Sequence, residues 1–169
     1  MLRLIPAALL LLAMNAASAA PDDAKHRYAG KWRIEKSEPA PWAKTPDMIE
    51  AKEVKRLTGA EVQFAADHIA GPQPIACKDP NYELKQYPAE GLFQGALEEY
   101  GDPSTTPAAM AAKLGFGKEV SSLVTGCASE IEFHELLDGQ LAFALNNSIY
   151  RMRRQDAPPA PPAKPKGSP

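Results

Sequence analysis

The sequence predicts a mainly β protein, an antiparallel barrel of about eight strands with helical insertions near residues 46–57 and 90–114. Two observations carry this prediction. Residues 130–154 have the pattern of three consecutive strands, and much of the remaining chain consists of short alternating segments bounded by turn-forming residues. Asp138-Gly139 and Asn146-Asn147 separate the three strands, and these dipeptides tolerate the positive φ angles of two-residue hairpin turns.

The middle strand of this meander has one strongly apolar face, on which Leu141, Phe143 and Leu145 alternate with smaller or polar residues. A few strands bury too little surface to be stable alone, so we expect further strands to share the core. The expected strands lie near residues 31–36, 60–65, 67–71, 75–78 together with 82–87, 119–126, 130–136, 140–146 and 148–154.

The first helical insertion has a well-defined start. Thr45 supplies an N-cap hydroxyl, and Pro46 suits the first helical position. Met48, Ala51 and Val54 recur at helical spacing, so we expect this stripe to face the core.

The second insertion, residues 90–114, is predicted to hold two helices. The first is stopped by Gly101, and the second begins at Thr106. Gly91 and Gly95 each cost a helix up to about 1 kcal/mol relative to Ala, so the N-terminal half of the first segment is either helix or loop.

The N-terminal residues have the pattern of a secretory signal peptide, residues 1–19. Arg3 gives a positive start, residues 4–14 are apolar, and Ala17-Ser18-Ala19 matches the small-residue cleavage site. The apolar run is too short to cross a bilayer comfortably, so we predict export to the periplasm or beyond without stable membrane insertion.

At the other end, residues 156–169 contain six prolines in 14 positions and almost no apolar bulk. Such a tail is expected to be extended and disordered. Residues 20–155 then form one β-barrel-like domain, a length that suits a single core.

Cys77 and Cys127 are the two cysteines of the chain. An even number in an exported protein predicts a structural disulfide, and two cysteines allow one pairing. A redox or metal pair would be expected to show CxxC spacing or neighbouring histidines, and neither occurs. We therefore predict no metal and no cofactor.

The mature chain carries 18 basic and 21 acidic side chains, a net charge of −3. This balance argues against a nucleic-acid partner, which would require a basic patch.

The sequence contains no specific catalytic motif, whether a nucleophile elbow, a phosphate loop or a zinc-protease helix. A spatially assembled acid/base pair remains open, with His134, Glu135 and His68 as candidates. A surface or hydrogen-bonded structural role is the more common one for such scattered histidines. Trp42, in a proline-bounded loop, and His68, at a hairpin, are the candidate binding residues.

One short pattern resembles a known family. Gly30-Lys31-Trp32 opens the first strand, and Arg151 or Arg153 lies on the last. This resembles the lipocalin/calycin pattern, in which an arginine from the final strand packs across the tryptophan. The resemblance implies an eight-stranded antiparallel barrel, a structural role for Trp32 and Arg151, and a capacity for apolar ligands. The chain also looks like small periplasmic proteins of Gram-negative bacteria, which implies no activity.

The predicted function is therefore that of a non-catalytic exported binding module of the bacterial envelope. Its expected partner is an envelope protein, which it would serve as an inhibitor or accessory factor, or a small apolar ligand. The alternative is an envelope hydrolase with a spatially assembled acid/base pair.

Overall fold

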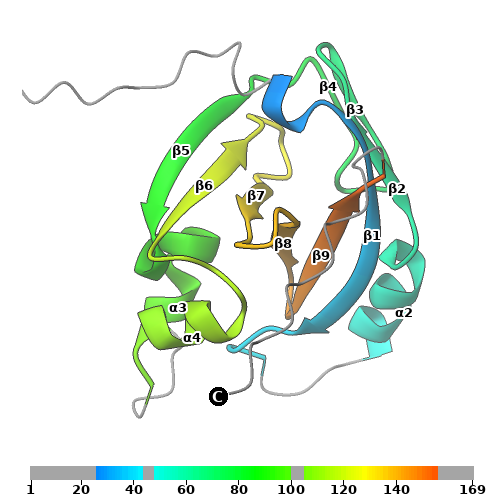
Figure 1. The fold of residues 1–169 in the computed structure, drawn as a ribbon. Coiled ribbons are helices and arrows are strands. Elements are labelled where there is room, and N and C mark those ends of the chain that lie inside the picture. The colour runs from blue at the N-terminus through cyan, green and yellow to red at the C-terminus, as the bar shows by residue number, and fades with distance from the viewer. Residues whose placement is uncertain (1–25, 44–47, 100–104, 156–169) are drawn as a thin grey trace, which may run out of the picture.

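Nine β-strands form one antiparallel sheet that curls into a half-barrel, as the computed structural model shows (Figure 1). The structure describes residues 26–43, 48–99 and 105–155. The expected signal peptide (1–19), the helix start at Thr45 and Pro46, and the tail (156–169) lie outside these residues. The strands are β1 (Gly30–Pro39), β2 (Glu61–Phe64), β3 (His68–Ala70), β4 (Cys77–Lys78), β5 (Glu83–Pro88), β6 (Glu119–Val124), β7 (Glu132–Glu135), β8 (Leu141–Leu145) and β9 (Ser148–Arg154).

The strand order is β4-β3-β2-β1-β9-β8-β7-β6-β5. Every neighbouring pair is consecutive in the chain except β1 and β9, which pair over most of their lengths. The sheet is thus a meander whose first strand joins its last, with its two edges at β4 and β5. A mainly β antiparallel fold was predicted, and it is confirmed.

The expected single strand from 75–78 together with 82–87 is two strands at opposite edges of the sheet. The chain turns at Asp79, whose φ is 50°, and Pro80 follows. This turn accounts for a ninth strand where about eight were predicted.

The concave face of the sheet is filled by a cluster of aromatic and aliphatic side chains. The Phe64 ring on β2 lies 5.0 Å from the Phe133 ring on β7, and Phe133 lies 5.5 Å from Phe143 on β8. Strands β2 and β7 are well separated in the sheet order, so this contact requires the curl. Trp32 is also buried here, and all four of these side chains are at most 3% exposed.

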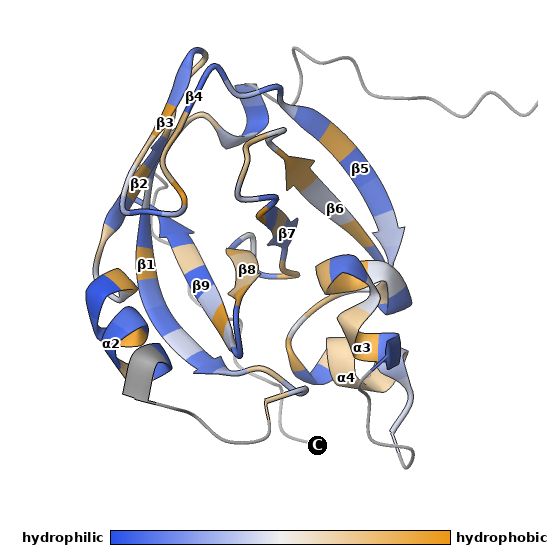
Figure 2. Cartoon of the chain, turned by 180° about the vertical axis from the view of Figure 1, so that it is seen from behind, coloured by the Kyte–Doolittle hydropathy of each residue, from blue (hydrophilic) through white to orange (hydrophobic). Residues whose placement is uncertain are grey.

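The opposite face of β6, β7 and β8 is covered by the segment between β5 and β6 (Figure 1). This segment contains a kinked 3-10 segment, η1 (Ala89–Gly95), then α3 (Ala96–Glu99) and α4 (Pro107–Lys113). A second hydrophobic cluster lies between this segment and the sheet. Successive residues of a strand point to opposite faces, so on β8 Leu141 and Phe143 face the concave side and Ala142 faces the helices. The edge strand β5 is mostly hydrophilic (Figure 2), as suits an exposed edge.

The helical insertion at 46–57 is observed as α2 (Met48–Leu57). The expected inward stripe is wrong in one member, because Ala51 is exposed. Glu50, Val54 and Leu57, spaced at i, i+4 and i+7, face the protein instead. Asn147 donates to the Glu50 carboxylate, and this bond satisfies an acid that the hydrophobic pattern alone would place outside.

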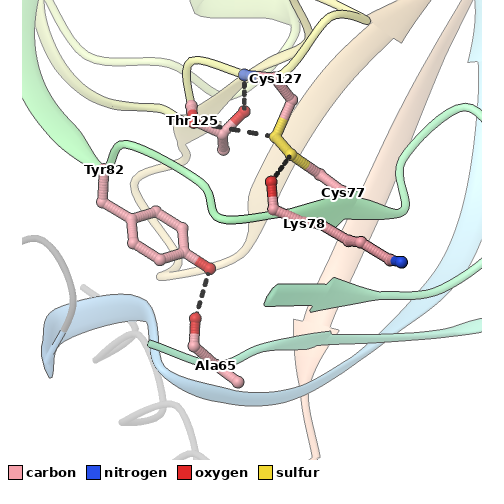
Figure 3. The surroundings of a disulfide bond; sticks show 6 residues. All are labelled: Ala65, Cys77, Lys78, Tyr82, Thr125 and Cys127. Carbon is pink, nitrogen blue, oxygen red and sulfur yellow. Dashed lines mark hydrogen bonds between the residues drawn. A yellow bond between two sulfur atoms is a disulfide. The ribbon is translucent and has the colours of Figure 1, made fainter. Parts of the chain in front are cut away.

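Three interactions lie at one end of the sheet, and two of them, the disulfide and the Tyr82–Ala65 hydrogen bond, join its open edges (Figure 3). The predicted Cys77–Cys127 disulfide is present and connects β4 to the chain after β6. The Asn81 amide donates to the Thr125 carbonyl at 2.8 Å. The Tyr82 hydroxyl donates to the Ala65 carbonyl at 2.8 Å. The Asn81 hydrogen bond extends the pairing of the neighbouring strands β5 and β6. The disulfide and the Tyr82–Ala65 hydrogen bond cross from one edge of the sheet toward the other, so they hold the curl.

Trp32 does meet an arginine of the last strand, but it is Arg154 and neither Arg151 nor Arg153. The Arg154 guanidinium carbon lies 5.0 Å from the centre of the Trp32 ring, in a cation–π contact. Tyr150 and Met152 on β9 face inward, so Arg151 must face outward. There it pairs with Glu38 at 2.6 Å.

Among the described residues, no helix has the length and apolar character needed to span a membrane.

Replacing both cysteines with alanine should lower the free energy of unfolding by about 4 kcal/mol, because the bridge closes a loop between residues 50 positions apart. Urea unfolding measures the loss. Hydrogen exchange should also become faster at the backbone amide of Asn81, and it should not change in β8. A loss below about 1 kcal/mol, with unchanged exchange at Asn81, would show that the noncovalent links suffice.

Arg151→Met should lower the free energy of unfolding by about 2 kcal/mol in the same assay. The Arg151 guanidinium also donates to the Leu114 carbonyl at the end of α4, at 3.0 Å, so the substitution leaves two acceptors without a donor. The matched control is Arg153→Met, because Arg153 pairs with Glu35 at the surface and should contribute less than about 1 kcal/mol. Equal losses in the two variants would contradict this assignment.

Candidate functional site

His134, one of the candidate acid/base residues, is buried, and both of its ring nitrogens form hydrogen bonds. Its side chain is on the helix-covered face of β7 and is 1% exposed. The Phe93 backbone amide donates to Nε2 at 3.3 Å. Because Nε2 accepts, the proton of the neutral ring is on Nδ1, which donates to the Ser122 hydroxyl at 2.6 Å.

Burial lowers the pKa of His134 to about 3, because desolvation disfavours the charged imidazolium. Aromatic rings surround it on several sides. The Phe93 ring is 4.8 Å away, and the Tyr87 and Phe116 rings are each 6.3 Å away, all edge-on. The imidazole is therefore neutral at ordinary pH.

The other two acid/base candidates do not join His134. Glu135 follows it on β7 and points to the opposite side of the sheet, where it accepts from the Tyr28 hydroxyl at 2.9 Å. His68 is exposed on β3 and is bonded to its neighbour Asp67 at 2.7 Å. The structure brings no two of the three candidates into a shared pocket.

Two adjoining pockets on the helix-covered face form the best candidate for a binding site. Their volumes are about 270 and 440 Å³. They share four lining residues, so we treat them as one feature and call it the outer groove. Its principal lining residues are Trp42, Phe93, Gln94, Thr125, Glu130, Ile131, Glu132, His134, Leu145 and Asn146.

Three separate parts of the chain build the outer groove. The loop after β1 supplies Trp42, whose indole N–H donates to the Asn146 carbonyl at 3.2 Å. The η1 segment supplies Phe93, whose ring is 5.6 Å from that of Trp42. The segment before β7 supplies Glu130, and the first residue of β7 is Glu132. The Trp42 ring is partly exposed in the groove, and the Phe93 ring, which is 8% exposed, packs against it.

Several residues that line the groove have backbone conformations of high energy. Phe93 and Gln94 have φ angles of 55° and 59°, and Glu130 has 53°. These are left-handed values, which non-glycine residues adopt at a cost of order 1–3 kcal/mol each. Asn146 shares the conformation, but as a hairpin-turn residue it does so with little strain. Of the five described non-glycine residues with positive φ, four line this one pocket.

Electrostatically, the lining of the outer groove carries acids and no lysine or arginine. Glu130 is exposed, and Glu132 accepts from the Tyr87 hydroxyl at 3.1 Å. Burial, together with the Glu132 charge, raises the pKa of Tyr87 to about 12, so the phenol stays protonated as a donor. Such a site suits a ligand that combines apolar bulk with a positive charge.

Of the two predicted binding residues, Trp42 lies in this groove and His68 does not. Sequence reasoning missed Phe93, Glu130 and Glu132. A signal for Phe93 was present, because Gly91 and Gly95 bracket it and mark a segment unsuited to a regular helix. The described residues contain no group of three or more potential metal ligands.

Comparison with known proteins finds no family model, no curated protein and no solved structure that matches this chain. The fold and the groove define its class by themselves: a disulfide-bonded, curled antiparallel β-sheet with an acidic aromatic groove on its outer face.

Because His134 is buried in its neutral form, the free energy of unfolding should decrease as the pH decreases. In the unfolded chain its pKa is near 6.5, and folding lowers it to about 3, so the unfolded state binds an extra proton between these values. Stability is lost as the pH falls below about 6.5, by up to about 1.4 kcal/mol per pH unit from this residue. Urea unfolding between pH 7 and pH 4 measures the slope.

His134→Gln should reduce that slope by about one proton, whatever its effect on stability at pH 7. Leu97→Ala, which loosens the same hydrophobic cluster without removing a titratable group, is the control and should leave the slope close to that of the wild type. An unchanged slope in His134→Gln would show that His134 is charged in the folded state.

Proposed function

We propose that this protein is a non-catalytic exported binding module of the bacterial envelope, and that it binds a protein partner through the outer groove. The observation that carries the proposal is the concentration of left-handed non-glycine backbone around a pocket with paired aromatic rings and carboxylates. Strain of this kind persists where the surrounding structure enforces it, and it clusters at binding and catalytic sites.

A protein partner is favoured over a small apolar ligand held inside the barrel. The resemblance to lipocalins permits an interior ligand, but the concave face is occupied by the protein's own side chains. Phe133, Phe143 and Tyr150 are each at most 1% exposed there. The outer groove is open to solvent and is formed by segments that a partner's surface can reach.

The hydrolase alternative gains no support among the described residues. Its three candidate side chains lie apart, and the central one is a neutral, fully bonded histidine. Binding requires none of them to titrate.

The export part of the proposal rests on two features. Residues 1–19 have the pattern of a signal peptide. The Cys77–Cys127 disulfide is a bond that persists in oxidising compartments and is rare in the cytosol.

The test begins with cross-linking in the envelope of intact cells, which nominates partners. Each nominated protein is then purified and titrated against the wild-type chain. We expect micromolar or tighter affinity for a true partner. Glu130→Lys, which reverses an exposed groove charge, should weaken the complex at least tenfold. Glu119→Lys is the matched control, because Glu119 is an exposed acid on β6 outside the groove.

Two results would overturn the proposal. One is a partner whose affinity is unchanged by Glu130→Lys and by Trp42→Ala, since this would place the interface elsewhere. The other is the absence of any purified protein that binds the wild-type chain, together with a bound small molecule in native mass spectra of the protein isolated from its cells.

A further inference from the structure

We propose that the outer groove accepts a proline-rich, lysine-bearing segment, and that residues 156–169 of this same chain occupy it. The inference rests on the proposed function, because it identifies the chemistry of the segment that the groove binds. It makes the tail an internal competitor for the partner.

The first argument is the match between aromatic walls and proline. Residues 156–169 read DAPPAPPAKPKGSP and contain six prolines. Such a segment populates the polyproline II conformation before it binds, so docking costs little conformational entropy. Grooves lined by aromatic side chains are the usual receptors for segments of this kind. Trp42, which is partly exposed and packs on Phe93 with ring centres 5.6 Å apart, provides that surface.

The second argument is charge. The tail ends its proline run with Lys164 and Lys166, and apart from Asp156 it has no acid. The groove supplies Glu130 and Glu132, with no basic side chain in its lining. The tail's two ammonium groups therefore have two carboxylates available, next to the aromatic wall that would hold the prolines.

The third argument is reach. The described chain ends at Gln155, just after β9, and the groove lies at the opposite end of β9, near Asn146. Seven residues of strand cover about 23 Å. A polyproline II segment advances about 3.1 Å per residue, so Lys164 can reach about 28 Å from Gln155 and Lys166 about 34 Å. The lysines are therefore placed at about the distance of the groove, and a shorter tail would fall short of it.

The test compares amide NMR spectra of the ¹⁵N-labelled mature chain with those of its variants, at about 20 mM and 500 mM NaCl. Lys164→Ala/Lys166→Ala should shift the amides of Phe93, Gln94 and Ile131 toward their high-salt positions. We expect the docked population to fall roughly threefold to tenfold, as the loss of two exposed ion pairs implies. Lys113→Ala, an exposed lysine on α4, is the control and should leave these amides in place.

The reciprocal change tests the same contact from the groove side. Glu130→Gln/Glu132→Gln keeps the side-chain shape and the acceptor for Tyr87, so the fold should persist. In this background the tail substitutions should have no further effect on the groove amides. Separate, additive effects of the two double variants would overturn the proposal, as would tail variants whose groove amides match the wild type at low salt.

Dilution separates docking within one chain from exchange of tails between two copies. Amide positions that are constant from about 20 to 500 µM support docking within the chain, and concentration-dependent positions overturn it.

The two proposals can also fail independently. A partner that binds in a Glu130-dependent way while the tail variants change nothing leaves the proposed function intact and sinks this inference. If the tail docks and no partner binds the groove, this inference stands and the proposed function fails.

Discussion

The short connection between β4 and β5 is the constraint on which the rest of the structure depends. Lys78 ends one edge strand and Glu83 begins the other, and the four residues between them span less than about 18 Å. The two edges of a nine-stranded sheet must therefore meet, and the sheet must curl. The curl brings Phe64 and Phe133 together across the interior, so the aromatic core is a consequence of this connection. The disulfide and the Tyr82–Ala65 hydrogen bond hold the same end closed.

The features that short-range interactions determine could be predicted from the sequence. The meander at 130–154 and the disulfide appeared as expected, because turn dipeptides, alternation and a single possible pairing define them. The assignment of Arg151 to Trp32 failed although the information was present. With Tyr150 and Met152 facing inward, only an even-numbered residue of β9 can meet an inward Trp32, and Arg154 is that residue. Strand order could not be predicted, because it depends on which segments meet across the curl.

The outer groove was largely beyond prediction for the same reason. Its wall joins Trp42, Phe93 and Glu130, which come from three distant parts of the chain, and no spacing in the sequence relates them. Trp42 was noticed because a large aromatic side chain between prolines is unusual. Phe93 was expected to lie in or near a helix. Its left-handed backbone follows from tertiary contacts that override helix propensity.

His134 connects these observations. The Phe93 amide sits in a strained, buried segment and needs an acceptor, and the neutral Nε2 of His134 provides it. A protonated imidazole would donate from both nitrogens and leave that amide without a partner. Burial among aromatic rings holds the pKa of His134 near 3, and so keeps the acceptor available over the whole range of ordinary pH. The residue that invited a catalytic hypothesis thus fixes the backbone of the groove wall. The same burial that keeps the imidazole neutral places its Nε2 against the Phe93 amide of the groove wall.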